Sequence, residues 1–193
     1  MTTPKQDAMI WMNNIFGAEI DSALAGSPIP KKLLIAIGIQ ETYYLWAKLY
    51  KTATPAEVLA VCVGDTIDFP KRASAWPKNR AELELHPRGK EMFKVARDAL
   101  IRVSKLNSGY AAPAKNPDKF CHGFGMFQYD IQFFRDSKAD EDFFLQGKWA
   151  TWTGTLGRGI AELKGALAIL YGKNKQTLSH DECVYLGIAY NRG

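Results

Sequence analysis

The chain has 193 residues, of which 47% are apolar and 23% are charged, as is usual for a soluble globular protein. Its net charge of +5 is compatible with an anionic polymer, such as cell wall or nucleic acid, as a partner. The basic residues do not cluster with aromatic residues as they do on a nucleic-acid interface, so we expect no nucleic-acid partner. Three cysteines without a CxxC pair give no sign of a disulfide framework.

The N-terminal residues MTTPKQDAMIWMNN lack the basic region and apolar stretch of a secretory signal. The longest purely apolar run near Glu41, LLIAIGI, is far too short to cross a bilayer. We therefore expect a monomeric protein that is made in the cytoplasm and has no integral membrane segment. If it acts in the cell wall or periplasm, a route other than an N-terminal signal must take it there.

Apolar spacing and capping signals predict a mainly helical protein with little or no β-sheet. In chain order, the expected helices cover residues 6–24, about 30–50, a short stretch after the capping box at 54–57, 88–105, 156–171, and a last stretch from the capping box at 179–182 to Asn191. Ser27 is the expected cap of the second helix, and Gly64 is the expected stop of the third. Residues 65–85 are expected to be irregular and residues 107–120 to form a loop.

Glu41 places one carboxylate within the apolar helical stretch LLIAIGIQETYYLW. By helical spacing, its neighbours on the same face are Leu34, Ile37 and Leu45. A carboxyl group among such side chains loses hydration, which favours its protonated form, and a protonated glutamate can give its proton to a glycosidic oxygen. This stretch alone also fits a structural glutamate at the edge of the apolar stripe, with its head in solvent or paired with Lys48.

Three motifs occur in a characteristic order. They are Glu41-Thr42, Gly125-Met126-Phe127-Gln128-Tyr129-Asp130 and Ala189-Tyr190-Asn191-Arg192-Gly193. Together they resemble the lysozyme-like superfamily of peptidoglycan-cleaving enzymes, in particular goose-type lysozymes and lytic transglycosylases related to the soluble type. In that family a catalytic glutamate, followed by a small hydroxyl residue, precedes a Gly-Leu-Met-Gln segment and then an Ala-Tyr-Asn-x-Gly motif. This chain has threonine where serine is usual.

The resemblance implies that Glu41 is the general acid, which protonates the glycosidic oxygen between N-acetylmuramic acid and N-acetylglucosamine. It also implies a set of substrate-binding residues, namely Gly125, Met126, Gln128, Tyr129, Tyr190 and Asn191. A glycine lets the backbone approach a sugar, a glutamine side chain both donates and accepts, and a tyrosine packs under a ring while its hydroxyl bonds. For Tyr190 and Asn191 the alternative is an ordinary helix C-terminus. We expect no metal or cofactor.

A second carboxylate decides between a hydrolase and a transglycosylase. An inverting hydrolase needs a base about 6.5–9.5 Å from the acid, with water between them. By the resemblance, Asp130 matches the aspartate after the glutamine segment of goose-type enzymes, and Asp118 stands near the place of their other aspartate. A transglycosylase needs neither, because the 6-hydroxyl of the sugar attacks. Asp65 is a weaker candidate, more simply read as a turn residue.

Asp130 is expected to face the same cleft as Gln128, because residues two apart in an extended segment point to the same side. The 87 positions between Glu41 and Gln128 exceed the family's separation. The resemblance covers about residues 5–46 and 120–193. Residues 47–118 are therefore expected to form an inserted helical subdomain beside the cleft, within one lysozyme-like domain over residues 1–193. Relatives continue past the third motif, so a further domain in a longer parent protein is one alternative and loss of the last helices is the other.

Other functions stay open on the sequence. One alternative is a non-catalytic glycan-binding or structural domain with the lysozyme-like fold. Another is a chitinase-like or chitosanase-like glycosidase, which would cleave a different polymer. Cys121, His122, His180 and Cys183 are potential zinc ligands, but adjacent ligands are awkward and free cysteine is commonly a buried small hydrophobe. The expected function is cleavage of β-1,4 glycosidic bonds in peptidoglycan by a muramidase or a lytic transglycosylase.

Overall fold

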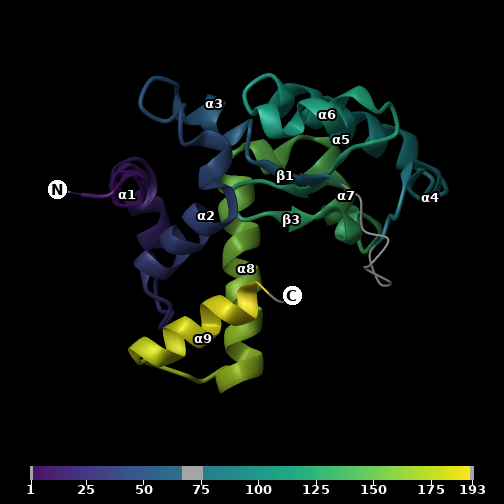
Figure 1. Ribbon diagram of the computed structural model, residues 1–193. Helices are drawn as coiled ribbons and strands as arrows, with labels where there is room; N and C mark the ends of the chain where they lie inside the picture. The colour runs from purple at the N-terminus through teal and green to yellow at the C-terminus, as the bar shows by residue number, and fades with distance from the viewer. Residues whose placement is uncertain (1, 67–75, 192–193) are drawn as a thin grey trace. The chain divides into compact units, whose positions relative to one another are not determined.

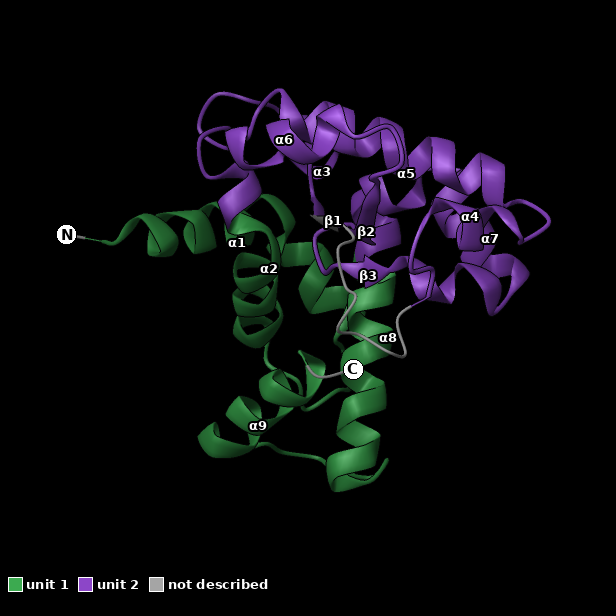
Figure 2. Cartoon of the chain, turned by 45° about the vertical axis from the view of Figure 1, so that its right-hand side comes forward, with its two compact units in different colours: residues 1–43, 156–193 green, residues 44–155 purple. Residues whose placement is uncertain are grey.

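Helices dominate the structure, as the sequence predicts, and one small three-stranded sheet accompanies them. The computed structural model describes residues 2–66 and 76–191, with only the backbone described at residues 65 and 66. The chain divides into two compact units (Figures 1 and 2). Unit 1 comprises residues 1–43 and 156–193, and unit 2 comprises residues 44–155. Unit 2 is therefore one continuous segment, which contains the predicted insertion and also residues 119–155.

The described residues of unit 1 form four helices: α1 (Pro4–Ala23), most of α2 (Lys31–Trp46), most of α8 (Trp152–Tyr171) and α9 (His180–Tyr190). Each helix contributes apolar side chains that are buried, including Met12, Ile20, Leu34, Leu163 and Leu186. The predicted cap of α2 is wrong. The Ser27 hydroxyl accepts from the backbone N–H of Ile29 at 3.3 Å, so it closes a turn before the helix begins.

Both predicted capping boxes are confirmed. Thr54 precedes α3 (Pro55–Leu59), and its hydroxyl accepts from the backbone N–H of Glu57 while the Glu57 carboxylate accepts from the N–H of Thr54. Ser179 and Glu182 form the same reciprocal pair at the start of α9. These bonds satisfy N–H groups that a helix start leaves without a helical acceptor, so four consecutive residues suffice to predict them.

The sheet lies in unit 2 and is antiparallel in the order β1 (Val63–Thr66), β2 (Cys121–Phe124), β3 (Tyr129–Asp130). Gly64 was expected to end α3, but it lies in β1 opposite Gly123, and α3 ends at Leu59. The reading of Asp65 as a turn residue is also wrong, because its backbone belongs to β1; its side chain lies outside the described part of the chain.

Besides α3, the described part of unit 2 contains α4 (Arg80–Glu84), α5 (Gly89–Ser104), η1 (Ser108–Tyr110), α6 (Ala111–Lys115), η2 (Ile131–Arg135), α7 (Lys138–Leu145) and η3 (Lys148–Ala150). Helix α5 buries an apolar stripe that includes Met92, Ala96, Ala99 and Val103, and it packs on β1 and β2. Figure 1 shows α5 and α6 above the sheet. The loop predicted over residues 107–120 contains η1 and α6, and Asn79 caps α4 within the stretch expected to be irregular.

Among the described residues, none of the helices combines the length and the apolar character needed to cross a membrane.

Candidate functional site

The residues singled out from the sequence fall into two groups, one in each unit, and each group is described within its own unit. Unit 1 holds Glu41, Tyr190 and Asn191. Unit 2 holds Asp118, Gly125, Met126, Gln128, Tyr129 and Asp130.

Glu41 lies in α2 at the border of an apolar face. Leu34, Ile37 and Leu45, which share this face by helical spacing, are all buried, whereas Glu41 is half-buried. The next residue, Thr42, is fully buried, and its hydroxyl donates to the carbonyl oxygen of Gly38 at 2.9 Å. Glu41 thus stands at the edge of the apolar stripe and is partly accessible, a position that fits both the catalytic and the structural interpretation of this residue.

Tyr190 is the last residue of α9, and the fold of unit 1 brings it close to Glu41. Burial raises the pKa of the Tyr190 phenol well above its ordinary value, and the negative charges of Glu41 and Glu162 raise that pKa further. The phenol therefore keeps its proton throughout the physiological pH range. It can act as a neutral hydrogen-bond donor beside the two carboxylates.

Glu162, in α8, is a carboxylate of this group that the sequence did not reveal. It lies in the expected helix over residues 156–171, at an exposed position of an ordinary amphipathic pattern. No motif marks it, and only the fold of unit 1 brings its charge close enough to affect the pKa of Tyr190.

Asn191 is the C-terminal cap of α9, and its side-chain amide donates to the carbonyl oxygen of Gly187 at 3.3 Å. It is exposed. This arrangement is the helix C-terminus that the sequence left open as the alternative for this position. The last two residues of the third motif lie outside the described residues.

Gln128 ends the turn that joins β2 to β3, and its φ of 53° is left-handed. The expectation of an extended segment through Gln128 and Asp130 is therefore wrong. The chain reverses here between paired strands, with Gly125 at φ 81° and the backbone N–H of Gln128 bonded to the Gly125 carbonyl oxygen at 3.1 Å. A left-handed residue other than glycine costs about 1–2 kcal/mol, so the surrounding structure must stabilise it.

The side chain of Gln128 folds back over the sheet. Its amide Nε2 donates to the carbonyl oxygen of Gly125 at 2.9 Å and, more weakly, to that of Cys62 at 3.5 Å. Gln128 is only partly buried, whereas the other residues assigned to substrate binding in unit 2 (Gly125, Met126 and Tyr129) are buried.

Met126 and Tyr129 take part in packing. Met126 is fully buried, and Tyr129 is 8% exposed, stacked on Phe133 with ring centroids 4.6 Å apart. The Tyr129 hydroxyl donates to the buried Asp140 carboxylate at 2.9 Å. Both side chains therefore contribute to the aromatic core of unit 2 in this structure.

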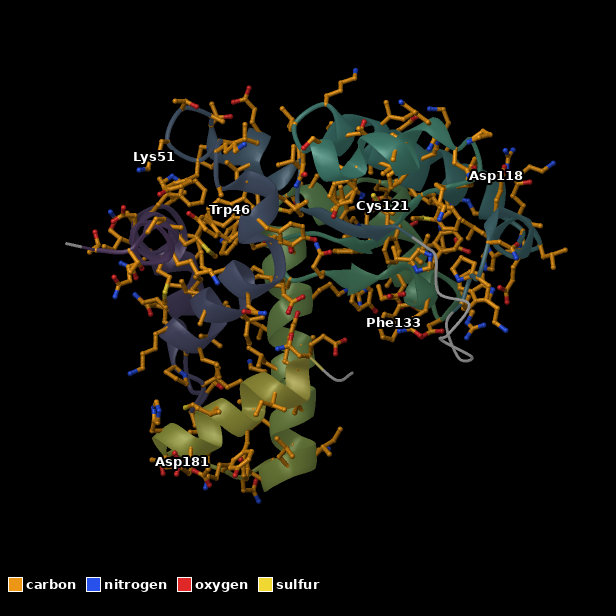
Figure 3. All side chains as sticks on the ribbon, in the orientation of Figure 1. Trp46, Lys51, Asp118, Cys121, Phe133 and Asp181 are labelled. Carbon is orange, nitrogen blue, oxygen red and sulfur yellow. The ribbon has the colours of Figure 1, made fainter. Side chains whose placement is uncertain are left out.

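The two candidate second carboxylates have different surroundings. Asp130 accepts from the backbone N–H of Gln132 at 2.8 Å and so caps η2. Asp118 is exposed beside α4 at the outer edge of unit 2 (Figure 3), and its carboxylate pairs with Arg80 at 3.3 Å. Asp130 is half-buried and follows the hairpin turn that contains Gln128, whereas Asp118 lies on the outer surface.

The potential zinc ligands are divided between the units. Cys121, in β2 (Figure 3), and His122 are buried in unit 2, while His180 and Cys183 belong to α9 in unit 1. Within residues 2–66 and 76–191, no group of three or more histidine, cysteine, aspartate or glutamate side chains is arranged to hold a metal ion.

A hollow of about 500 Å³ lies between α5 and α7 in unit 2, away from the candidate residues. Its walls include Arg88, Glu91, Lys138 and Asp142. Arg88 pairs with Glu91 on the α5 wall, and Lys138 pairs with Asp142 on the α7 wall, both at 2.7 Å, so these charges are neutralised within each wall.

Comparison of the chain with protein-family models, with curated proteins and with solved structures finds no match in any of the three. The functional argument therefore depends on the three motifs and on the geometry described above.

Proposed function

We propose that the protein cleaves β-1,4 glycosidic bonds of peptidoglycan, between N-acetylmuramic acid and N-acetylglucosamine, with Glu41 as the general acid. The observation that carries the proposal is the electrostatic effect of Glu41 on Tyr190 within unit 1, because these residues come from the first and the third of the ordered motifs. A half-buried carboxyl group on an apolar helix face is suited to deliver a proton.

In the proposed reaction, Glu41 gives its proton to the glycosidic oxygen as the bond from that oxygen to the anomeric carbon breaks. In a transglycosylase the 6-hydroxyl of the N-acetylmuramic acid then bonds to the anomeric carbon and returns its proton to Glu41. In an inverting hydrolase, water bonds to the anomeric carbon instead, and a second carboxylate takes its proton. Tyr190 remains protonated throughout and offers a donor to the Glu41 carboxylate after the proton has left.

The decisive experiment compares Glu41→Gln with the wild-type chain on purified cell wall, by zymography and by assay of released sugars. The amide preserves the shape of the side chain but delivers no proton, so the rate is expected to fall by about 10²–10⁴-fold or more. Glu19→Gln is the matched control, since Glu19 is an exposed glutamate of α1 and its substitution should leave the rate unchanged. Wild-type activity in Glu41→Gln would refute the assignment.

Mass analysis of the products distinguishes the two mechanisms. Anhydro ends identify a transglycosylase, and reducing ends identify a hydrolase, because only water leaves a free hydroxyl on the anomeric carbon.

A further inference from the structure

Five segments of unit 2 meet at one place on the sheet, and three of them bring polar side chains there. Gly64 of β1 lies opposite Gly123 of β2, and the Gln128 amide from the following turn lies over both. The hydroxyl of Tyr44, near the end of α2, lies 3.1 Å from the position that a Cβ on Gly64 would occupy. Tyr110 of η1 joins the group through a hydrogen bond of 3.3 Å between its hydroxyl and that of Tyr44.

The two glycines are required for this arrangement. A Cβ on Gly64 would lie 2.1 Å from the Gln128 Oε1, and a Cβ on Gly123 would lie 2.3 Å from the same atom. Either side chain would displace the amide. The paired glycines thus keep open a place on the sheet that the carboxamide occupies, and the left-handed backbone of Gln128 turns the side chain toward it.

The orientation of the Gln128 amide determines whether its Nε2 or its Oε1 can contact a ligand. Both hydrogen bonds of the Gln128 side chain to other described residues are donated by Nε2, to the carbonyl oxygens of Gly125 and Cys62. The reverse assignment would place Oε1 against two carbonyl oxygens, which repel it. Oε1 is therefore the acceptor available to a ligand, held beside the hydroxyl of Tyr44.

The two tyrosines add ring surface and hydroxyl groups. Tyr44 is 51% exposed and Tyr110 is half-buried. A pyranose has C–H faces that pack on aromatic rings and a rim of hydroxyl groups, and its N-acetyl substituent adds an amide N–H donor. An oriented carboxamide oxygen beside tyrosine rings and hydroxyls matches that combination.

We propose that Tyr44, Tyr110 and Gln128 form a subsite for one N-acetylated sugar ring on unit 2, and that residues 47–118 serve to supply Tyr110 and Gly64 to it. The identity of the sugar as part of a wall glycan rests on the proposed function. The subsite itself does not, because it is formed within unit 2 and does not involve Glu41.

The experiment measures binding of tri-N-acetylchitotriose by calorimetry to the full chain, both in the wild type and in Glu41→Gln, where the probe stays intact. Tyr110→Phe removes one hydroxyl, and Gly64→Ala displaces the Gln128 amide without removing a polar group. Each is expected to weaken binding about five-fold to ten-fold, as the loss of one hydrogen bond does. Tyr185→Phe, at an exposed tyrosine of α9, is the matched control and should bind as the parent does.

Circular dichroism verifies that each variant is folded. If Gly64→Ala is not folded, Tyr44→Phe replaces it as the second variant, because it also removes one hydroxyl group. Unchanged affinity in Tyr110→Phe and in the second folded variant would overturn the subsite, and so would a wild-type chain that does not bind the probe. Equal affinity for the deacetylated trisaccharide would overturn the acetamide contact. Weaker binding in these variants together with full cleavage by Glu41→Gln would refute the proposed catalytic role while leaving the subsite standing.

Discussion

Tyr190 is half-buried, and its loss of hydration together with the negative charges of Glu41 and Glu162 raises the pKa of its phenol well above that of tyrosine in water. In the unfolded chain it ionises near its ordinary value of about 10. The folded state therefore binds a proton that the unfolded state loses above this pH. The stability linked to this proton is fully present below pH 10 or so and is lost as the pH rises further.

We predict that the free energy of unfolding of the wild type falls more steeply than that of Tyr190→Phe between neutral pH and about pH 11. The extra loss should be about 1 kcal/mol at the upper end, measured by denaturant titration at each pH. The ultraviolet absorbance of tyrosinate gives an independent check, since folded wild type and folded Tyr190→Phe should form equal amounts at this pH. Parallel stability curves would mean that the phenol ionises normally.

A substitution at Asp130 can test its role in catalysis without changing the stability of the protein. Asparagine caps a helix about as well as aspartate, so Asp130→Asn should keep the hydrogen bond from Gln132 and a wild-type Tm. If Asp130 orients water, as in a goose-type hydrolase, the rate of cleavage should fall at least ten-fold while the reducing ends of the products persist. A wild-type rate of cleavage in Asp130→Asn would show that Asp130 serves only to cap η2.

At the level of elements, the hairpin between β2 and β3 depends on Gly125. Its φ of 81° is left-handed, and a Cβ there would lie 2.6 Å from the hydroxyl oxygen of Thr155 and 3.1 Å from the carbonyl oxygen of Trp149. We predict that Gly125→Ala destabilises the protein by about 2 kcal/mol, a fall in Tm of roughly 4–8 °C for a chain of this size.

Gly157→Ala is the control for this prediction. Gly157 lies within α8, and a Cβ there would meet no atom within 4 Å. Alanine is the better helix former, so this variant should be neutral or more stable by up to about 1 kcal/mol. Equal thermal shifts in the two variants would show that the turn is not under steric constraint.

Local signals predicted the helices better than the sheet. The capping boxes at Thr54 and Ser179 and the stripe of α5 involve neighbours within one or two turns, so the sequence displays them directly. The strands β1, β2 and β3 have four, four and two residues, which is too short for alternation to be visible. Gly64 was therefore read as a helix stop, although its role is to leave room for Gln128 on the sheet.

At the scale of the whole molecule, residues 47–118 share a sheet and a packed helix with the segment that follows them. Strand β1 from this stretch pairs with β2, and α5 packs on both. We predict that replacing residues 47–118 by a flexible Gly-Ser linker abolishes cooperative unfolding, because β2 loses its partner strand and its helical cover. Circular dichroism with thermal melting measures this. A sharp transition in the deletion variant would show that the segment folds apart from the rest.

The sequence by itself determined the helical class, the starts of α3 and α9, and Glu41 on an apolar helix face, because each depends on residues within a few positions of one another. The tertiary structure decided which distant groups meet. It brought Glu162 and Glu41 to Tyr190 in unit 1, and Tyr110 to Tyr44 and Gln128 in unit 2, and it placed Met126 and Tyr129 in the core. Such meetings depend on how helices and strands pack, and packing depends on side chains far apart in the chain, which no local pattern records.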